Sequence, residues 1–258
     1  RASGIVVQVG TQLRSMGSFT GARELCQSGA LGTVGRIEQC RNSHSPYWYQ
    51  YLKEVREDEV DWQEFLYNRP MRPFDAVTYS GWYGFREFSD GAVPGFGSHF
   101  IDLVHYLTGA TFPESAVCLG GQYTWKDDYH FTCEDHVQAV WTYPNFLVSY
   151  STNFGSGEGN SFKIFGNEAT LDLTDWNSPL LLRGAGTGGR AVEREPIEHI
   201  NRPDHMLNWL QCLRSRQTPH ASIDAGYQHA VAVLMAVQAR DTGRRMCFDQ
   251  ASRTIYPA

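Results

Sequence analysis

The stretch HVQAVWTY at residues 136–143, PN at 144–145 and FLVSYSTN at 146–153 decides the fold of this 258-residue chain. Both flanks alternate between apolar and polar residues, the pattern of a strand with one buried face. Pro144 and Asn145 are turn residues, so the stretch predicts a β-hairpin. Outward from it, further short strands are expected at 35–42, 115–122, 162–165 and 171–173, and the strands over 115–173 are expected to form an antiparallel meander.

Helical patterns flank the meander. They predict helices over 19–27, 98–107, 203–216 and 224–241, the second with its apolar residues on one side. The stretch 45–98 shows no regular period and is rich in aromatic residues; a long loop inside a compact domain is commonly a functional wall or lid. The predicted class is α+β, a large, mostly antiparallel open sheet with helices on one face.

The first residues show a different pattern. Ile5 to Val9 is short, apolar and β-branched, which is typical of a buried parallel strand. Such a strand needs neighbours, so we expect its sheet to lie upstream. Residues 1–4, which begin with Arg1, are expected to end a preceding helix. The prediction is therefore a remnant of an upstream domain over residues 1–16 and an α+β domain over 17–258.

Composition excludes several classes of partner. The formal net charge of −6 gives no basic surface for nucleic acid, and no segment has the ~18 consecutive apolar residues of a membrane span. The cysteines are widely spaced without a C-x-x-C pair, which predicts reduced thiols and a cytoplasmic protein. They are Cys26, Cys40, Cys118, Cys133, Cys212 and Cys247.

Two motifs suggest chemistry that their context does not support. The run from Gly184 to Gly189 matches G-x-G-x-x-G, but the charged, Pro-stopped segment after it does not predict the helix that a pyrophosphate site requires. We interpret it as a surface loop. His130, Cys133 and His136 are of zinc-ligand type, but their spacing is unusual and no fourth ligand is evident, so no metal site is expected.

The sequence GSHFID at residues 97–102 points more directly to chemistry. His99 would lie in the first turn of a helix after a glycine-rich approach, where a neutral imidazole can act as a general base. A capping or core histidine is the equal alternative. His105, six residues on, is expected to be structural.

The order of several motifs resembles the Gfo/Idh/MocA oxidoreductases. They are VGTQLR at 9–14, the run from Glu24 to Gly32, Asp61-Trp62, RPF at 72–74, GSHFID at 97–102, Lys126-Asp127, GNEATL at 166–171 and the stretch from Asn208 to Pro219. The resemblance implies an enzyme with a Rossmann domain that binds NAD or NADP and an α+β domain that binds a sugar or polyol and forms a homo-oligomer. The family's Glu-Lys-Pro lysine and phosphate-binding glycines would lie upstream, so this chain alone is not expected to bind NAD(P).

The resemblance also assigns roles to residues. His99 would be the acid/base; Asn42, His44, Trp82 and Lys126 are candidates for the substrate wall, since aromatic faces suit sugar rings and polar groups orient hydroxyls. Gln12 and Arg14 would contact the cofactor, or else link the two domains structurally.

One position departs from the family. Gly95 stands where many members have an aspartate four residues before the histidine, and a histidine without that carboxylate loses its orienting partner. Cofactor-recycling glycosidase, lyase or epimerase chemistry is therefore an alternative to plain dehydrogenation. A non-catalytic carbohydrate-binding subunit is a second alternative.

The meander also suggests a surface for self-association. Its outer face is expected to carry large aromatic residues, which would need covering by a second copy of the chain. These residues are Trp141, Tyr143, Tyr150 and Phe154.

Overall fold

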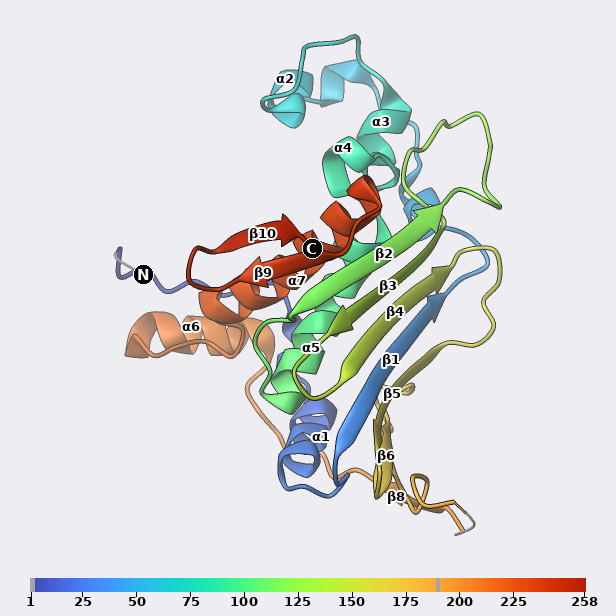
Figure 1. Ribbon diagram of the computed structural model, residues 1–258. Helices are drawn as coiled ribbons and strands as arrows, with labels where there is room; N and C mark the ends of the chain where they lie inside the picture. The colour runs from blue at the N-terminus through green and yellow to red at the C-terminus, as the bar shows by residue number, and fades with distance from the viewer. Residues whose placement is uncertain (1–2, 189–190) are drawn as a thin grey trace.

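A computed structural model describes residues 3–188 and 191–258 of the chain. Its centre is one open sheet in the order β10-β9-β2-β3-β4-β1-β5-β6-β7-β8 (Figure 1). The strands are β1 (Val34–Asn42), β2 (Ser115–Gly121), β3 (His136–Thr142), β4 (Leu147–Asn153), β5 (Ser161–Gly166), β6 (Ala169–Asp172), β7 (Leu180–Arg183), β8 (Glu193–Pro196), β9 (Met246–Asp249) and β10 (Thr254–Pro257). The predicted α+β class and the predicted strands of the meander are confirmed.

All neighbouring strands run antiparallel except one pair. Strand β1 lies between β4 and β5 and pairs parallel with β4, with Ile37 opposite Val148. The predicted hairpin is β3–β4, in which Trp141 faces Val148 across the pair. The four-residue strands β7 to β10 were not predicted, because each is too short to show a clear alternation.

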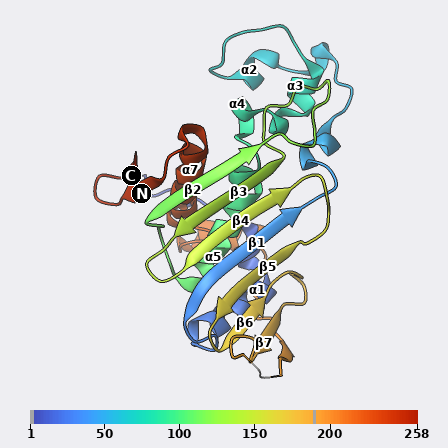
Figure 2. The same ribbon diagram turned by 45° about the vertical axis from the view of Figure 1, so that its right-hand side comes forward.

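Helices cover one face of the sheet. They are α1 (Gly17–Gln27), α5 (Ser98–Thr108) and α7 (Ile223–Thr242), whereas α6 (His205–Ser215) lies to the side, where Trp209 Nε1 donates to the Val6 carbonyl at 3.5 Å. Figures 1 and 2 show α1, α5 and α7 behind the sheet, with no helix in front of it among the described residues. We call the uncovered side the open face.

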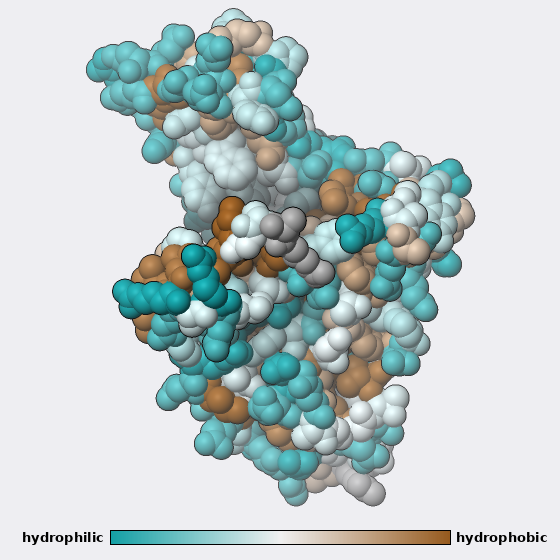
Figure 3. Space-filling view, turned by 90° about the vertical axis from the view of Figure 1, so that its left-hand side faces the viewer, coloured by the Kyte–Doolittle hydropathy of each residue, from teal (hydrophilic) through white to brown (hydrophobic). Residues whose placement is uncertain are grey.

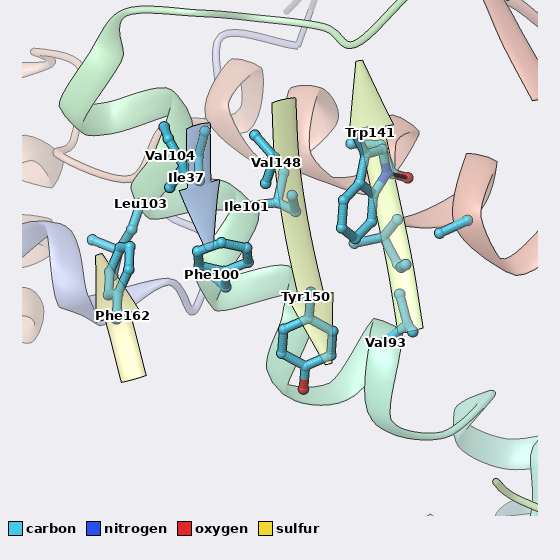
Figure 4. Close-up of a cluster of buried hydrophobic side chains, with 14 of the residues drawn as sticks. Ile37, Val93, Phe100, Ile101, Leu103, Val104, Trp141, Val148, Tyr150 and Phe162 are labelled. Carbon is cyan, nitrogen blue, oxygen red and sulfur yellow. Dashed lines mark hydrogen bonds between the residues drawn. The ribbon is translucent and has the colours of Figure 1, made fainter. Parts of the chain in front are cut away.

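The core lies between α5 and the central strands (Figure 4). Phe100, Ile101 and Val104 of α5 are at most 1% exposed, and Trp141 donates from Nε1 to the carbonyl of Ala232 in α7. The sequence placed four large aromatic residues on the outer face of the sheet, namely Trp141, Tyr143, Tyr150 and Phe154, and this prediction is wrong. Each is at most 4% exposed, since rings of this size have the most apolar surface to bury; the first three pack toward the helices, and Phe154 packs on Tyr47 and Trp48.

Short helices replace the irregular structure expected after β1. Residues 43–90, which we call the lobe, project from the end of the sheet (Figure 1). They contain η2 (Tyr47–Tyr51), η3 (Glu57–Glu59), α2 (Trp62–Leu66), α3 (Ala76–Ser80), η4 (Trp82–Gly84) and α4 (Arg86–Ser89). Asp61 and Asp75 cap α2 and α3 by accepting backbone hydrogen bonds, and aromatic rings pack between the turns.

The predicted strand over 5–9 is wrong for this chain. The segment is extended, but only Gln8 forms a bridge, with Ser222, and Ile5 is 71% exposed. Its apolar residues have no neighbouring strand among the described residues. The helix end predicted for residues 1–4 falls partly on Arg1 and Ala2, which lie outside the described residues.

Candidate functional site

His99 lies in the first turn of α5, directly after η5 (Val93–Gly97), a turn of π-helix. The imidazole is half-buried, and neither ring nitrogen forms a hydrogen bond with residues 3–188 or 191–258. Burial lowers the pKa of His99 below its ordinary value of 6.5; Asp102 partly opposes this shift and His229 adds to it. The ring is therefore neutral near pH 7 and free to accept a proton, and π-turns of this kind are frequent at functional sites.

A buried carboxylate lies under this turn. Asp102 has no exposed surface; its Oδ2 accepts from Arg14 Nε at 2.7 Å, and its Oδ1 lies 3.3 Å from His229 Nδ1. Burial alone would raise the pKa of Asp102, but His229 and Arg14 lower it, and the balance is below the ordinary value. The carboxylate thus remains charged and fixes the base of the turn that presents His99.

One aromatic ring lies beside His99, and a second ring and a guanidinium contact the first. The Phe96 ring centroid lies 6.2 Å from that of His99 and 6.0 Å from that of Trp176, with which it stacks at 20°. The Arg41 guanidinium lies 4.9 Å from the Phe96 ring. Arg41 and Trp176 also line a hollow of about 480 Å³ together with Asp175. Stacked rings beside charged and amide groups are suited to a polyhydroxylated ligand.

Two tyrosines of the lobe approach the turn that precedes His99. A β-carbon at Gly95, four residues before His99, would lie 2.3 Å from the Tyr83 hydroxyl and 2.5 Å from the Tyr47 hydroxyl. The Tyr83 ring lies 4.7 Å from that of Trp82, which lines a second hollow of about 430 Å³ beside Tyr51. The lobe that supplies these residues projects from the body in Figure 3, and a recess separates the two.

The structure brings only one of the four predicted substrate-binding residues to the His99 turn. Trp82 is connected to the His99 turn through Tyr83, as described above. Asn42 lies on the open face, where it lines a different hollow with Gln138 and Ser151, and its side chain donates to the carbonyl of Glu158. His44 and Lys126 are exposed in loops beyond the ends of the strands. The structure does not bring these three residues to the His99 turn.

The two residues proposed to contact the cofactor lie in η1 (Gln12–Ser15). Gln12 is exposed. Arg14 is bound to Asp102 and lies over the Tyr106 ring at 5.1 Å, which fits the structural alternative for this residue.

Sequence reasoning did not include Arg41, Phe96, Trp176, Tyr47 or Tyr83 in the site. For Arg41 a signal existed, because strand alternation places it on the same face as buried Ile37 and Gln39. The other four belong to loops and short turns, where no period indicates the direction of a side chain.

The structure also locates the glycine-rich motif and the histidine-cysteine cluster noted in the sequence. Gly184 to Gly188 forms turns after β7, and strand β8 follows instead of a helix; Gly189 lies outside the described residues. His136 pairs with Asp135 at 2.6 Å and Asn153 at 2.9 Å. Within 3–188 and 191–258, no group of three metal-ligating residues could hold a metal ion.

Three further predictions concern the thiols, His105 and membrane spans. All six cysteines are free, and Cys118, Cys133 and Cys212 are buried. His105 is buried and bonds the Tyr143 hydroxyl at 2.8 Å, in agreement with the expected structural role. In the described part of the chain, no helix has the length and apolarity needed to cross a bilayer.

Comparison with protein families gives a match over most of the chain. Residues 63–248 match the model described as "Oxidoreductase family, C-terminal alpha/beta domain". No curated protein matches the chain.

Several solved structures share the fold at low sequence identity. An aldose-aldose oxidoreductase from Caulobacter crescentus, in complex with glycerol, has a TM-score of 0.67 and 16% identity, over 96% of this chain and 65% of its own. Levoglucosan dehydrogenase, in complex with NADH and levoglucosan, has a TM-score of 0.68 and 14% identity, over 96% and 67%. An oxidoreductase domain protein from Kribbella flavida has a TM-score of 0.65 and 16% identity, over 95% and 66%. This chain spans about two thirds of the length of these proteins, or slightly less.

Proposed function

Because this chain belongs to the Gfo/Idh/MocA oxidoreductase family and contains its C-terminal domain, we propose that it is the substrate-binding part of a NAD(P)-dependent enzyme that acts on a sugar or polyol. The observation that carries the proposal is His99, a neutral imidazole without a hydrogen-bond partner among the described residues, beside stacked Phe96 and Trp176. In this role His99 takes the proton of the substrate hydroxyl.

The ligands named with similar structures support the substrate class. Glycerol and levoglucosan, with which two of them were solved, are both polyhydroxylated. The hollow lined by Trp176, whose ring is linked to His99 through Phe96, contains groups suited to such a ligand, namely the Arg41 guanidinium and the Asp175, Asn160 and Asn177 side chains.

The nicotinamide cofactor does not fit the residues of this chain alone. None of the described strands leads through a glycine-rich turn into a helix, the arrangement that holds a pyrophosphate. We therefore propose that residues 1–16 join this domain to a Rossmann domain that supplies the cofactor. The backbone bond from Val9 N to Ala221 O, 2.8 Å long, attaches that segment to the α+β domain.

The test is turnover of the full-length protein with NAD or NADP and a panel of sugars and polyols. His99→Ala is expected to reduce kcat by roughly 10²-fold or more while the unfolding transition stays in place. His199→Ala, a histidine in the segment after β8, is the matched control. Equal turnover in the two variants would contradict the assignment of His99.

Gly95 favours a second candidate function. Without a carboxylate at this position, the surroundings of His99 differ from those in an ordinary family dehydrogenase, and transient use of the cofactor for glycoside cleavage, elimination or epimerisation is the alternative. Net NADH formation from a sugar supports dehydrogenation. Product formation without net change in cofactor absorbance supports the alternative.

We further propose that the open face mediates a homo-oligomer. Val117 and Leu119 of β2 are 42% and 75% exposed and Leu147 of β4 is 47% exposed, and a second copy of the sheet could cover them. The sequence assigned this contact to Trp141, Tyr143, Tyr150 and Phe154, which are buried, so the proposal rests on the three aliphatic residues instead.

A further inference from the structure

Two tyrosine hydroxyls meet at one point of the surface of η5. The place of a β-carbon at Gly95 is within 2.5 Å of both the Tyr47 and the Tyr83 hydroxyl, so any larger residue at position 95 would displace them. Positions four apart on a helical turn lie on the same side, which puts the hydroxyls one turn before the His99 ring. The lobe thus brings two hydroxyl groups to the face of the helix that presents the imidazole.

Packing fixes both rings in this position. The Tyr47 ring contacts Trp48 and Phe154 at centroid distances of 5.3 and 5.5 Å, and the Tyr83 ring at 5.1 Å. The Tyr83 backbone is held as well, because its carbonyl accepts from Ser89 Oγ at 2.7 Å. Rings held from several sides place their hydroxyls with little freedom, which a positioned hydrogen-bond donor requires.

The two hydroxyls differ in their access to a ligand. The Tyr47 oxygen is buried and has no hydrogen-bond partner among the described residues. Leaving a buried hydroxyl without a partner costs roughly 1–3 kcal/mol of folding free energy, so stability does not explain the position of this hydroxyl. Tyr83 is only half-buried, and its ring contacts those of Trp82 and Tyr51, which line the second hollow.

Both phenols stay protonated at neutral pH. Burial raises the pKa of Tyr47 well above 10, and the neighbouring Tyr83 raises it further. Burial also raises the pKa of Tyr83, while Tyr47 acts in the opposite direction. Each hydroxyl is therefore available as a donor, and Tyr83, which is only half-buried, is the one that a ligand can reach.

We propose that the Tyr83 hydroxyl, whose ring is held in place by the Tyr47 ring, donates a hydrogen bond to the substrate oxygen whose proton His99 removes. The inference rests on the proposed function. In the step, the substrate O–H bond breaks and its proton moves to the His99 imidazole, which leaves a negative charge on the substrate oxygen. Tyr83 keeps its proton throughout and stabilises the negative charge that develops on the oxygen.

The experiment compares Tyr83→Phe and Tyr47→Phe with Tyr129→Phe, an exposed tyrosine of the loop before β3, in the full-length protein. Tyr83→Phe is expected to lower kcat by roughly 10²-fold with KM changed less than about threefold. Its acidic pH limb should match that of the wild type, because His99 is unchanged. Tyr47→Phe is expected to lower kcat less and to keep or raise Tm, because it removes an unsatisfied hydroxyl.

Each outcome is decisive. If Tyr83→Phe turns over as fast as Tyr129→Phe while His99→Ala is inactive, the proposed function stands and this inference is wrong. If the wild type turns over no sugar or polyol, both are wrong. Should Tyr83→Phe fail to fold, 3-fluorotyrosine at position 83 keeps the shape and lowers the phenol pKa. The alkaline limb of kcat must then move to lower pH, and the same label at position 129 must leave it unchanged.

Discussion

Replacing Arg14 with methionine decides whether this residue is a structural link or a cofactor contact. In the structure its guanidinium compensates Asp102, a carboxylate with no exposed surface, and only 11% of the Arg14 side chain is exposed. Methionine keeps the apolar stem over Tyr106 but leaves the buried charge with His229 as its remaining partner. Breaking a buried pair from one side costs about 3–5 kcal/mol. With a urea slope of about 3 kcal/mol per molar, the midpoint falls by about 1 to 1.7 M.

The pH dependence has a defined sign. In the wild type the folded pKa of Asp102 is below 3.8, so its stabilising contribution is present above that value and is lost as the pH falls through the folded pKa. Without Arg14, burial raises the folded pKa, and the charged carboxylate destabilises the protein at neutral pH. The deficit of the Arg14→Met variant should therefore be largest at pH 7 and shrink toward pH 4.

The chain offers a matched control in Arg23. Its guanidinium also lies 5.1 Å from the Tyr106 ring, but it contacts no buried carboxylate, so Arg23→Met should cost less than about 1 kcal/mol. Urea denaturation of the three proteins at several pH values is the assay. Arg14→Met with the stability of Arg23→Met at pH 7, together with weaker NAD(P) binding by the full-length protein, would refute the structural role.

Four further predictions can be checked directly. In the full-length enzyme, the log of kcat/KM should fall below a midpoint under pH 6.5, because the pKa of His99 is lowered and the neutral ring is the base; a midpoint above 6.5 would contradict this. Calorimetry should detect no micromolar NAD(P)H binding to the 258-residue chain. Leu119→Asp should shift an oligomer to monomer in light scattering, whereas Met71→Asp, on the lobe, should not. Gly21→Ala should cost roughly 1–3 kcal/mol, because its β-carbon would lie 1.9 Å from the Glu198 carbonyl oxygen, whereas Gly10→Ala meets nothing and should be nearly neutral.

The sequence predicted the sheet well where strands are long and alternate. The strands of the meander and the four longer helices lie within a few residues of their expected bounds, because each pairs a clear period with a turn or capping signal. It did not predict β9 and β10, which are four residues each; β9 pairs with β2 and β10 pairs with β9, so both depend on the edge of the sheet. Alternation also could not tell which face the helices cover. It correctly put Trp141 and Tyr143 on one side, but that side is the core.

The candidate site depends on the same choice of face. Along β1, Arg41 and Asn42 point to opposite sides of the sheet, so a shift of one residue moves a predicted substrate contact from the His99 side to the open face. Ile37, fully buried on the same strand, would have given the correct side, since Arg41 is four residues further and shares its face. No comparable local rule exists for Tyr83. Its position beside Gly95 follows from the path of the whole lobe, and the only trace in the sequence is a glycine where the family carries a carboxylate. A glycine at such a position therefore indicates space that another side chain occupies. The sequence does not identify that side chain, because its position depends on the fold of the lobe.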